Sequence, residues 1–249
     1  STPFGMGTYA SRVAVIGGGA TALAAVEGRD KVLRTAGRLL EVAAGDLVLE
    51  DARVFVKGAP ETGMSLADVA MAAYWAPQAR SENEDPYLSA TRFYDPKATY
   101  SNGCIVVVAE VDAATGVAHV QRVAAVEDCG TVLNPTIVEG QVRGAIAQGI
   151  GGALYEDAVY DDAGQPLATT YIDYLLPTTT EVPAIEVEHL ESPSPVSIGG
   201  IKGMGESGLI ASQGAVVSAV LDAIAPFEPD LTELELPLDP DRVLRLIGR

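Results

Sequence analysis

The sequence predicts an α+β fold in which helices pack on antiparallel or mixed sheets. Two strand-like runs flank the turn segment Asp112–Gly116 within residues 103–130, and this arrangement is a strong hairpin signal. Helix-like spacings of apolar residues occur at 8–43, and within 199–225 a glycine loop leads into a long apolar helix. Strand pairs with segregated helices favour α+β over a doubly wound parallel sheet.

Composition limits the partners and the chemistry. The chain has 249 residues, of which 48% are hydrophobic, so it can bury a core as one large domain or two small ones. A net charge of −18 disfavours nucleic acid and anionic membrane surfaces. No apolar run is expected to reach the roughly 20 residues that span a bilayer, so neither nucleic acid nor membrane is predicted as a partner.

Histidine and cysteine are scarce. Two histidines and two cysteines are scattered along the chain, which predicts neither a disulfide framework nor a metal site built from protein ligands. A reducing, cytoplasmic location is the default expectation for such cysteine usage. A metal carried by an organic cofactor remains compatible with this composition.

The N-terminal half predicts one or two helices within 8–43, followed by two shorter patterns. "LVLEDARVFVKG" is typical of a hairpin that turns at Glu50-Asp51. "SLADVAMAAYWA" predicts a helix with Ser65 as N-cap and Asp68 at the third position. Because 76–102 is rich in Pro, Ser, Asn and Asp, we expect a helix-rich segment at 1–80, a linker at 81–102 and an α+β segment at 103–249.

A second helix is predicted to begin at Asn134, the N-cap, with Pro135 at its first position. This helix carries an excess of glycine, and each glycine costs about 1 kcal/mol relative to alanine in a helix. Another helix or a ligand should therefore approach its backbone closely. The glycines stand at positions 140, 144, 149, 151 and 152. "DPDRVLRLIGR" predicts a short final helix.

The run "VAVIGGGATALAA" fits G-x-G-x-x-A through Gly17, Gly19 and Ala22, a pattern typical of NAD- or FAD-binding turns. That turn should follow one strand and precede a second strand and an acidic residue. Glu41 is the acidic candidate, but the residues before it are charged and have helical periodicity. The alternative is that these small residues let a helix pack tightly, and both hypotheses stay open.

"GGIKGMGESG" holds a single acid, Glu206, among five glycines, with Lys202 four residues earlier. A carboxylate at the start of a helix commonly complements the helix dipole. The flanking glycines also suit a bulky planar ligand that lies against the backbone, and they would hold the carboxylate beside it. Glu206 is then a general-base candidate.

Three stretches together carry a resemblance to a known family: "GMGTYASR", "DCGTVLNPTIVEGQVRGAIAQGIGGALYE" and "SPSPVSIGGIKGMGESG". In order and spacing they resemble the C-terminal part of the molybdopterin-binding large subunit of the xanthine dehydrogenase, aldehyde oxidoreductase and carbon monoxide dehydrogenase family. The resemblance runs from Thr2 to Ala225. It implies the cofactor-binding domain of a molybdenum hydroxylase, with helices packed on antiparallel or mixed sheets.

In that family the molybdenum is held by the dithiolene of a pterin cofactor, often extended in bacteria to molybdopterin cytosine dinucleotide. The resemblance implies that Glu206 is the general base that deprotonates a molybdenum-bound hydroxyl. The substrate would be small, such as an aldehyde, an N-heterocycle, a purine or carbon monoxide. Electrons would leave through 2Fe–2S clusters to FAD, both carried by partner subunits.

Cofactor-binding residues follow from the match, position by position. They are Thr8, Tyr9, Ser11 and Arg12 in the first motif, Asn134 and Gln141 in the second, and Lys202, Gly203, Met204 and Gly205 in the third. Ala10 stands where the family frequently has glycine.

The resemblance also implies partners: an iron–sulfur subunit, an FAD subunit and the N-terminal half of the molybdenum subunit, as a separate chain or as part of a longer polypeptide. We expect this chain alone to lack a complete active site. Two alternatives remain, a NAD- or FAD-dependent oxidoreductase that uses Gly17–Ala22 and a non-catalytic assembly subunit of the same fold.

Overall fold

The structure, a computed structural model, describes residues 7–76, 79, 87–229, 231–232 and 234–249. Its contacts divide the chain into two compact units, which are described separately below. The first unit comprises 16–96, and the second comprises the residues up to Val15 together with 97–249. The predicted division into 1–80, 81–102 and 103–249 stays a prediction. Part of the predicted linker, 81–86, lies outside the described residues.

In the first unit, a single helix α1 (Val13–Leu40) replaces the predicted one or two helices, and its first three residues belong to the second unit. Strands β1 (Leu47–Glu50), β2 (Arg53–Val56) and β3 (Ala59–Ser65) form an antiparallel meander. The predicted hairpin is confirmed, but its turn lies at Asp51-Ala52, one residue later than predicted, and these two residues have left-handed φ values of 45° and 57°. The core of this unit joins α1 and the sheet with helix α2 (Leu66–Trp75) through Val32, Ala36, Leu47, Val54 and Val69.

Helix α2 (Leu66–Trp75) begins where the capping pattern predicts. The Asp68 backbone N–H donates to the Ser65 hydroxyl oxygen at 3.1 Å. Strand β3 was not predicted, because "APETGMS" has no alternation of apolar residues and contains turn-forming types. Gly63 is required there, since a Cβ would lie 2.4 Å from the Val54 carbonyl oxygen.

The glycine triplet of α1 does not form a dinucleotide-binding turn. Gly17, Gly19 and Ala22 all lie inside the helix, so the strand–turn–helix geometry of that motif is missing from this segment. A Cβ on Gly19 would lie 2.3 Å from the Tyr94 ring. The alternative interpretation, tight packing through small residues, therefore describes this segment.

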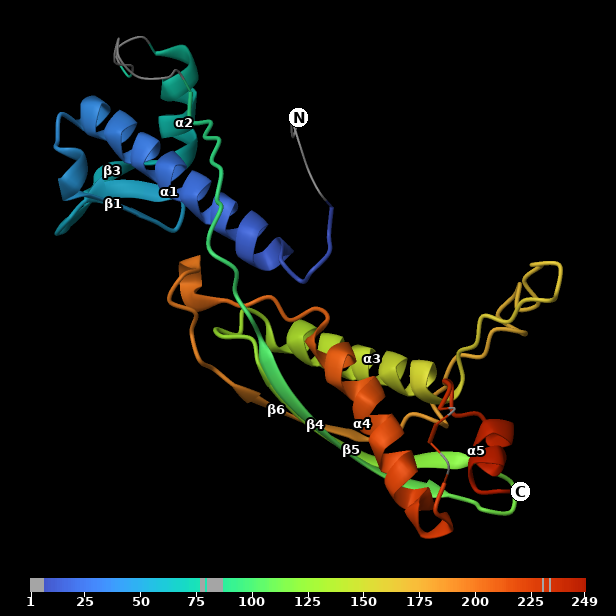
Figure 1. The fold of residues 1–249 in the computed structure, drawn as a ribbon. Helices are drawn as coiled ribbons and strands as arrows, with labels where there is room; N and C mark the ends of the chain where they lie inside the picture. Colours follow the sequence, from blue (N-terminus) through green and yellow to red (C-terminus); the bar gives the residue numbers. More distant parts are fainter. Residues whose placement is uncertain (1–6, 77–78, 80–86, 230, 233) are drawn as a thin grey trace. The chain divides into compact units, whose positions relative to one another are not determined.

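The second unit contains the predicted long hairpin, formed by β4 (Asn102–Val111) and β5 (Ala118–Asp128), whose turn includes Gly116 at φ 77°. Strand β6 (Ile185–Leu190), which was not predicted, pairs with β5 in parallel and gives the order β4-β5-β6 (Figure 1). Val123 of β5 stands opposite Ile185 of β6 in this register.

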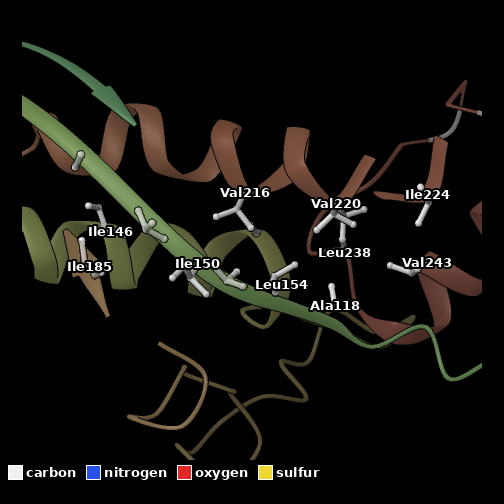
Figure 2. Packing of buried hydrophobic residues seen from close by; sticks show 14 of the residues in the cluster. Ala118, Ile146, Ile150, Leu154, Ile185, Val216, Val220, Ile224, Leu238 and Val243 are labelled. Atoms are coloured by element: carbon white, nitrogen blue, oxygen red, sulfur yellow. The ribbon is translucent and has the colours of Figure 1, made fainter. Parts of the chain in front are cut away.

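Helices α3 (Pro135–Leu154) and α4 (Ser207–Ile224) pack against each other, and α4 also packs on β4. The N-cap at Asn134 is confirmed, with the Ile137 N–H donating to its side-chain oxygen at 3.3 Å. Figure 2 shows Val216 and Val220 of α4 pointing into this core, with Ile150 of α3 beside them. The short final helix α5 (Pro240–Leu246) is also confirmed, with Asp239 as its N-cap.

The glycines of α3 explain how closely the two helices approach. A Cβ on Gly149 would lie 1.9 Å from the Ser212 hydroxyl oxygen, and one on Gly152 would lie 3.2 Å from Gln213. From the other side, a Cβ on Gly208 would lie 3.0 Å from Ala145. For these positions the close neighbour predicted by the glycine excess is helix α4.

The segment Ser207–Phe227 is the one described helical stretch that would be long and apolar enough to cross a membrane. The expectation that no apolar run has this length is corrected by that finding. Core helices of globular proteins satisfy the same criterion, and α4 buries Val216, Val220 and Ile224 completely in the core of the second unit.

Replacing Gly149 with alanine should destabilise the protein, because the added methyl overlaps Ser212 in a fully packed contact. Overpacking of this kind costs about 1–3 kcal/mol. Chemical denaturation of the chain measures the loss. The matched control is Gly144→Ala on the same helix, an exposed position with no described atom within 4 Å of the new Cβ. That variant should gain up to about 1 kcal/mol from helix propensity, so equal effects at both positions would contradict the packing argument.

Candidate functional site

A pocket of about 360 Å³ lies within the second unit, where three segments remote in sequence converge. The first segment precedes and begins α1, the second joins β5 to α3, and the third is the loop before α4. Of the predicted site residues, Thr8, Ser11, Arg12, Asn134, Gln141, Lys202, Met204 and Gly205 line the pocket. Tyr9, Gly203 and Glu206 are not among the lining residues.

Glu206 is tied to the first segment by a two-way contact with Ser11. The Ser11 hydroxyl donates to Oε2 of Glu206 at 2.8 Å, and the Glu206 backbone N–H donates to the Ser11 hydroxyl oxygen at 2.9 Å. These residues are 195 positions apart. One serine therefore fixes both the side chain and the backbone of the candidate base.

The backbone before α1 is strained at the same place. Ala10 and Ser11 both have φ of 53°, a left-handed conformation that costs non-glycine residues about 1–3 kcal/mol each. The glycine that the family frequently has at the position of Ala10 would adopt this φ without strain. Gly203 allows the loop before α4 to approach this segment, because a Cβ there would lie 2.0 Å from the Ser11 carbonyl oxygen.

Helix α3 contributes one wall through Ile137, Val138 and Gln141, which share a face at helical spacing. Gln141 donates from Nε2 to the Gly205 carbonyl at 3.3 Å, which ties α3 to the loop before Glu206. On the opposite segment, the Arg12 guanidinium stacks over the Tyr9 ring at 4.3 Å from its centroid. This cation–π contact orients a positive charge at the pocket.

Lys202 anchors the loop to the end of β5. Its Nζ lies 3.2 Å from Oδ2 of Asp128, and its backbone N–H donates to the Cys129 carbonyl at 2.8 Å. Asp128 also accepts the backbone N–H groups of Gly130 at 2.9 Å and Ser192 at 3.1 Å. The lysine therefore lines the pocket with its stem while its ammonium neutralises a buried carboxylate.

These contacts set the electrostatics at the end of β5. Burial alone would raise the pKa of Asp128, but the hydrogen bonds from Ser192 and Gly130 and the Lys202 ammonium together hold that pKa well below its usual range. Burial raises the pKa of the Cys129 thiol, and the nearby Asp128 carboxylate adds to this. Cys129 therefore presents a neutral thiol to the pocket wall.

Asp128 was missed by the sequence analysis. A signal was present, because an acid at the end of a predicted strand and directly before Cys129-Gly130 must place its charge at the strand end. Its partner Lys202 lies 74 residues later in the chain (202 minus 128). No local pattern connects the two.

Replacing Asp128 with asparagine should destabilise the protein at neutral pH by about 3 kcal/mol, because it leaves the Lys202 ammonium without its buried partner. A carboxyl whose folded pKa is depressed contributes stability above its unfolded pKa, near 3.9, and loses it as pH falls toward the folded pKa. The gap between wild type and variant should therefore be largest near neutral pH and shrink in acid. Denaturation curves from pH 3 to pH 7 measure it.

The double variant Asp128→Asn with Lys202→Met serves as the control. Removing the unpaired charge should recover part of the stability lost in the single variant. A double variant no more stable than Asp128→Asn would contradict the assigned pairing.

Comparison with known proteins identifies the family to which this chain is similar. The family described as "Molybdopterin cofactor-binding domain" matches residues 1–183. The nicotine 6-hydroxylase large subunit of Paenarthrobacter nicotinovorans is 45% identical over 97% of this chain and 30% of its own length. The carbon monoxide dehydrogenase large chain of Hydrogenophaga pseudoflava is 39% identical over 95% of this chain and 29% of its own.

Among solved structures, quinoline 2-oxidoreductase from Pseudomonas putida 86 superposes with a TM-score of 0.85 at 49% identity, over 99% of this chain and 31% of that one. The chain thus spans about 30% of the length of the relatives it matches. The matching family and the fold confirm the expectation drawn from the three motifs. The chain belongs to the molybdopterin cofactor-binding domain family of the molybdenum hydroxylases.

Proposed function

We propose that this chain is the cofactor-binding, catalytic portion of a molybdenum hydroxylase, with Glu206 as the general base. The observation that carries the proposal is the Ser11–Glu206 contact at the edge of the pocket. This contact fixes the Glu206 carboxylate beside the pocket, whose walls come from all three sequence motifs. Helix α4 begins directly after this carboxylate, which therefore lies at the N-terminal end of the helix.

The pocket residues fit a molybdopterin group. Ile137, Val138, Ile201 and Met204 supply apolar walls for a planar ring. Hydrogen-bonding side chains line the same cavity, as a heterocycle with donor and acceptor edges requires, and Arg12 adds a cation suited to a phosphate. The residues that would hold the group are Thr8, Tyr9, Ser11, Arg12, Asn134, Gln141, Lys202, Gly203, Met204 and Gly205. A cytosine dinucleotide extension is part of the proposal.

The chemistry divides between cofactor and protein. When bound, the cofactor supplies a two-electron oxidant and a Lewis acid that lowers the pKa of a hydroxyl nucleophile. Glu206 accepts the proton of that nucleophile at Oε1 while Ser11 holds Oε2, so the carboxylate keeps one orientation during the transfer. The Gln141 contact to the Gly205 carbonyl keeps the loop at a fixed distance from α3.

The names of the relatives support a proposal for the substrate class and the partners. The relatives quoted above at 45% and 49% identity are named for nicotine and quinoline, both N-heterocycles. We therefore favour an N-heterocycle that contains a pyridine ring over an aldehyde, a purine or carbon monoxide. Relatives named as large subunits or large chains support assembly with other subunits. The proposed partners are the N-terminal half of the molybdenum subunit and subunits carrying 2Fe–2S clusters and FAD, in the cytoplasm.

Glu206→Gln in the assembled enzyme should lower kcat by about 10²- to 10⁴-fold, because an amide cannot accept the proton. Molybdenum and pterin content should stay at the wild-type level, since the amide oxygen can still accept the Ser11 hydrogen bond. Steady-state turnover and metal analysis on the same preparation measure both.

The matched control is Glu139→Gln, a glutamate on α3 that pairs with Arg143 and does not line the pocket. It should leave turnover unchanged. Full turnover in Glu206→Gln would overturn the proposed base and favour a non-catalytic assembly subunit.

A further inference from the structure

An arm formed by residues 157–175 extends from the second unit after helix α3 (Figure 1). Tyr171 and Ile172 of this arm are 85% and 87% exposed. A single exposed apolar side chain is ordinary on a protein surface, but several gathered on one short segment indicate an interaction surface. The exposed large apolar side chains of the arm are Val159, Tyr160, Leu167, Tyr171, Ile172 and Leu175.

Hydrogen bonds within the arm hold it in one conformation. The Leu167 N–H donates to the Val159 carbonyl at 2.8 Å. The Asp161 N–H donates to the Gln165 carbonyl at 3.0 Å, and the Asp161 carboxylate accepts the N–H groups of Ala163 and Gln165, both at 2.9 Å. Because these bonds exist before any contact is made, binding through the arm loses little conformational entropy.

The base of the arm is anchored to the rest of the second unit. The Tyr174 hydroxyl donates to Oε2 of Glu156 at 2.7 Å, directly after α3. The Arg242 guanidinium of α5 lies 3.1 Å from Oδ2 of Asp157. Both ends of the arm are therefore fixed, and its exposed apolar side chains are presented in a defined direction.

A hollow of about 380 Å³ lies between the arm and the segment before α5. Leu167 and Leu175 line it from the arm, and Pro237 lines it from the other side. Asp173 adds a carboxylate to the same lining. Apolar walls with an acid at their edge suit a long basic side chain, whose stem packs on the leucines while its charge meets the carboxylate.

The arm contains four carboxylates and no basic side chain. The sequence has no lysine or arginine between Arg143 and Lys202. Because binding surfaces have complementary potentials, the surface that receives the arm should combine apolar side chains with lysine or arginine. The four acids are Asp157, Asp161, Asp162 and Asp173.

We propose that the arm docks onto the part of the molybdenum large subunit that lies outside this chain. The chain spans only 30% of the nicotine 6-hydroxylase large subunit and 31% of the quinoline 2-oxidoreductase chain, so the larger part of such a subunit is present in a fixed ratio to cover the arm. A second copy of this chain fits less well, because it brings the same acidic arm and a net charge of −18. This inference rests on the proposed assembly into a molybdenum hydroxylase.

Limited digestion with chymotrypsin tests whether the arm is covered. This protease cleaves after tyrosine and leucine, and the arm offers the exposed residues Tyr160, Leu167 and Tyr171. Cleavage at these residues should be at least about tenfold slower in the assembled enzyme than in this chain alone, because exposed loops are preferred cleavage sites. Equal cleavage rates in the two samples would overturn the proposal.

Tyr171→Asp combined with Ile172→Asp should uncover the arm in the assembled enzyme, because two charges cannot be buried in an apolar contact. Cleavage after Tyr160 and Leu167 should rise to the rate seen in the chain alone. The Tm of the chain alone should not change, since both substituted side chains are exposed.

The matched control is Tyr171→Phe combined with Ile172→Leu, which keeps the apolar surface and should keep the arm protected. If both double variants were cleaved equally, or if neither were cleaved, these two side chains would not hold the arm in its contact.

Photo-cross-linking identifies what covers the arm. The probe is p-benzoylphenylalanine, a photo-reactive amino acid, introduced in place of Asp162 in the assembled enzyme. Mass spectrometry should find it joined to a segment of the remaining molybdenum subunit that contains lysine or arginine. Links to a second copy of this chain or to an iron–sulfur or FAD subunit would overturn the choice of occupant, and the absence of any link would overturn the docking.

Neither digestion nor cross-linking depends on turnover, so the two proposals can fail separately. Full turnover in Glu206→Gln would overturn the proposed base and leave the docking of the arm intact. A normal loss of turnover in Glu206→Gln, together with an arm that is cleaved as fast in the assembled enzyme as in the chain alone, would overturn the docking only.

Discussion

Close, parallel packing of α3 against α4 is the constraint on which the candidate site depends. Successive contacts run in the same direction along both helices, from Gly208 against Ala145 to Gly149 against Ser212. Both N-termini therefore lie at the same end of the helix pair. One N-terminus carries Asn134 and the other carries Glu206, so the packing of two glycine-containing faces brings two motifs to one pocket.

The same end of the second unit contains strained backbone and buried acidic side chains, both of which destabilise a fold. Ala10 and Ser11 have left-handed backbones, and Glu127 and Asp128 are buried acids. Strain and buried charge persist only where the surrounding structure holds them in place, and they concentrate at functional sites. Asp128 is compensated by Lys202, whereas Glu127 is not compensated to the same degree. This contrast distinguishes an anchoring carboxylate from one whose presence calls for a functional explanation.

Local chemistry made much of the fold predictable. The caps at Ser65 and Asn134 and the turn at Gly116 depend on neighbouring residues, and each is found where the pattern placed it. Strand β6 could not be predicted in the same way, because it pairs in parallel with β5 across about 60 residues that give no local signal. The glycine triplet of α1 left two interpretations open for a related reason, since only the surroundings distinguish a packing glycine from a nucleotide-binding one.

The sequence by itself determined the helices, the long hairpin and the family, because spacing, capping and motif order are properties of the chain alone. It also supplied the proposal that Glu206 is the base. The tertiary structure decided which distant groups meet: Ser11 with Glu206, Lys202 with Asp128, and Glu127 with Gly103. Such pairings depend on where the backbone returns after tens or hundreds of residues. Hydrogen bonds and buried charges act over a few ångströms in space, which is why those partners became visible only in the folded chain.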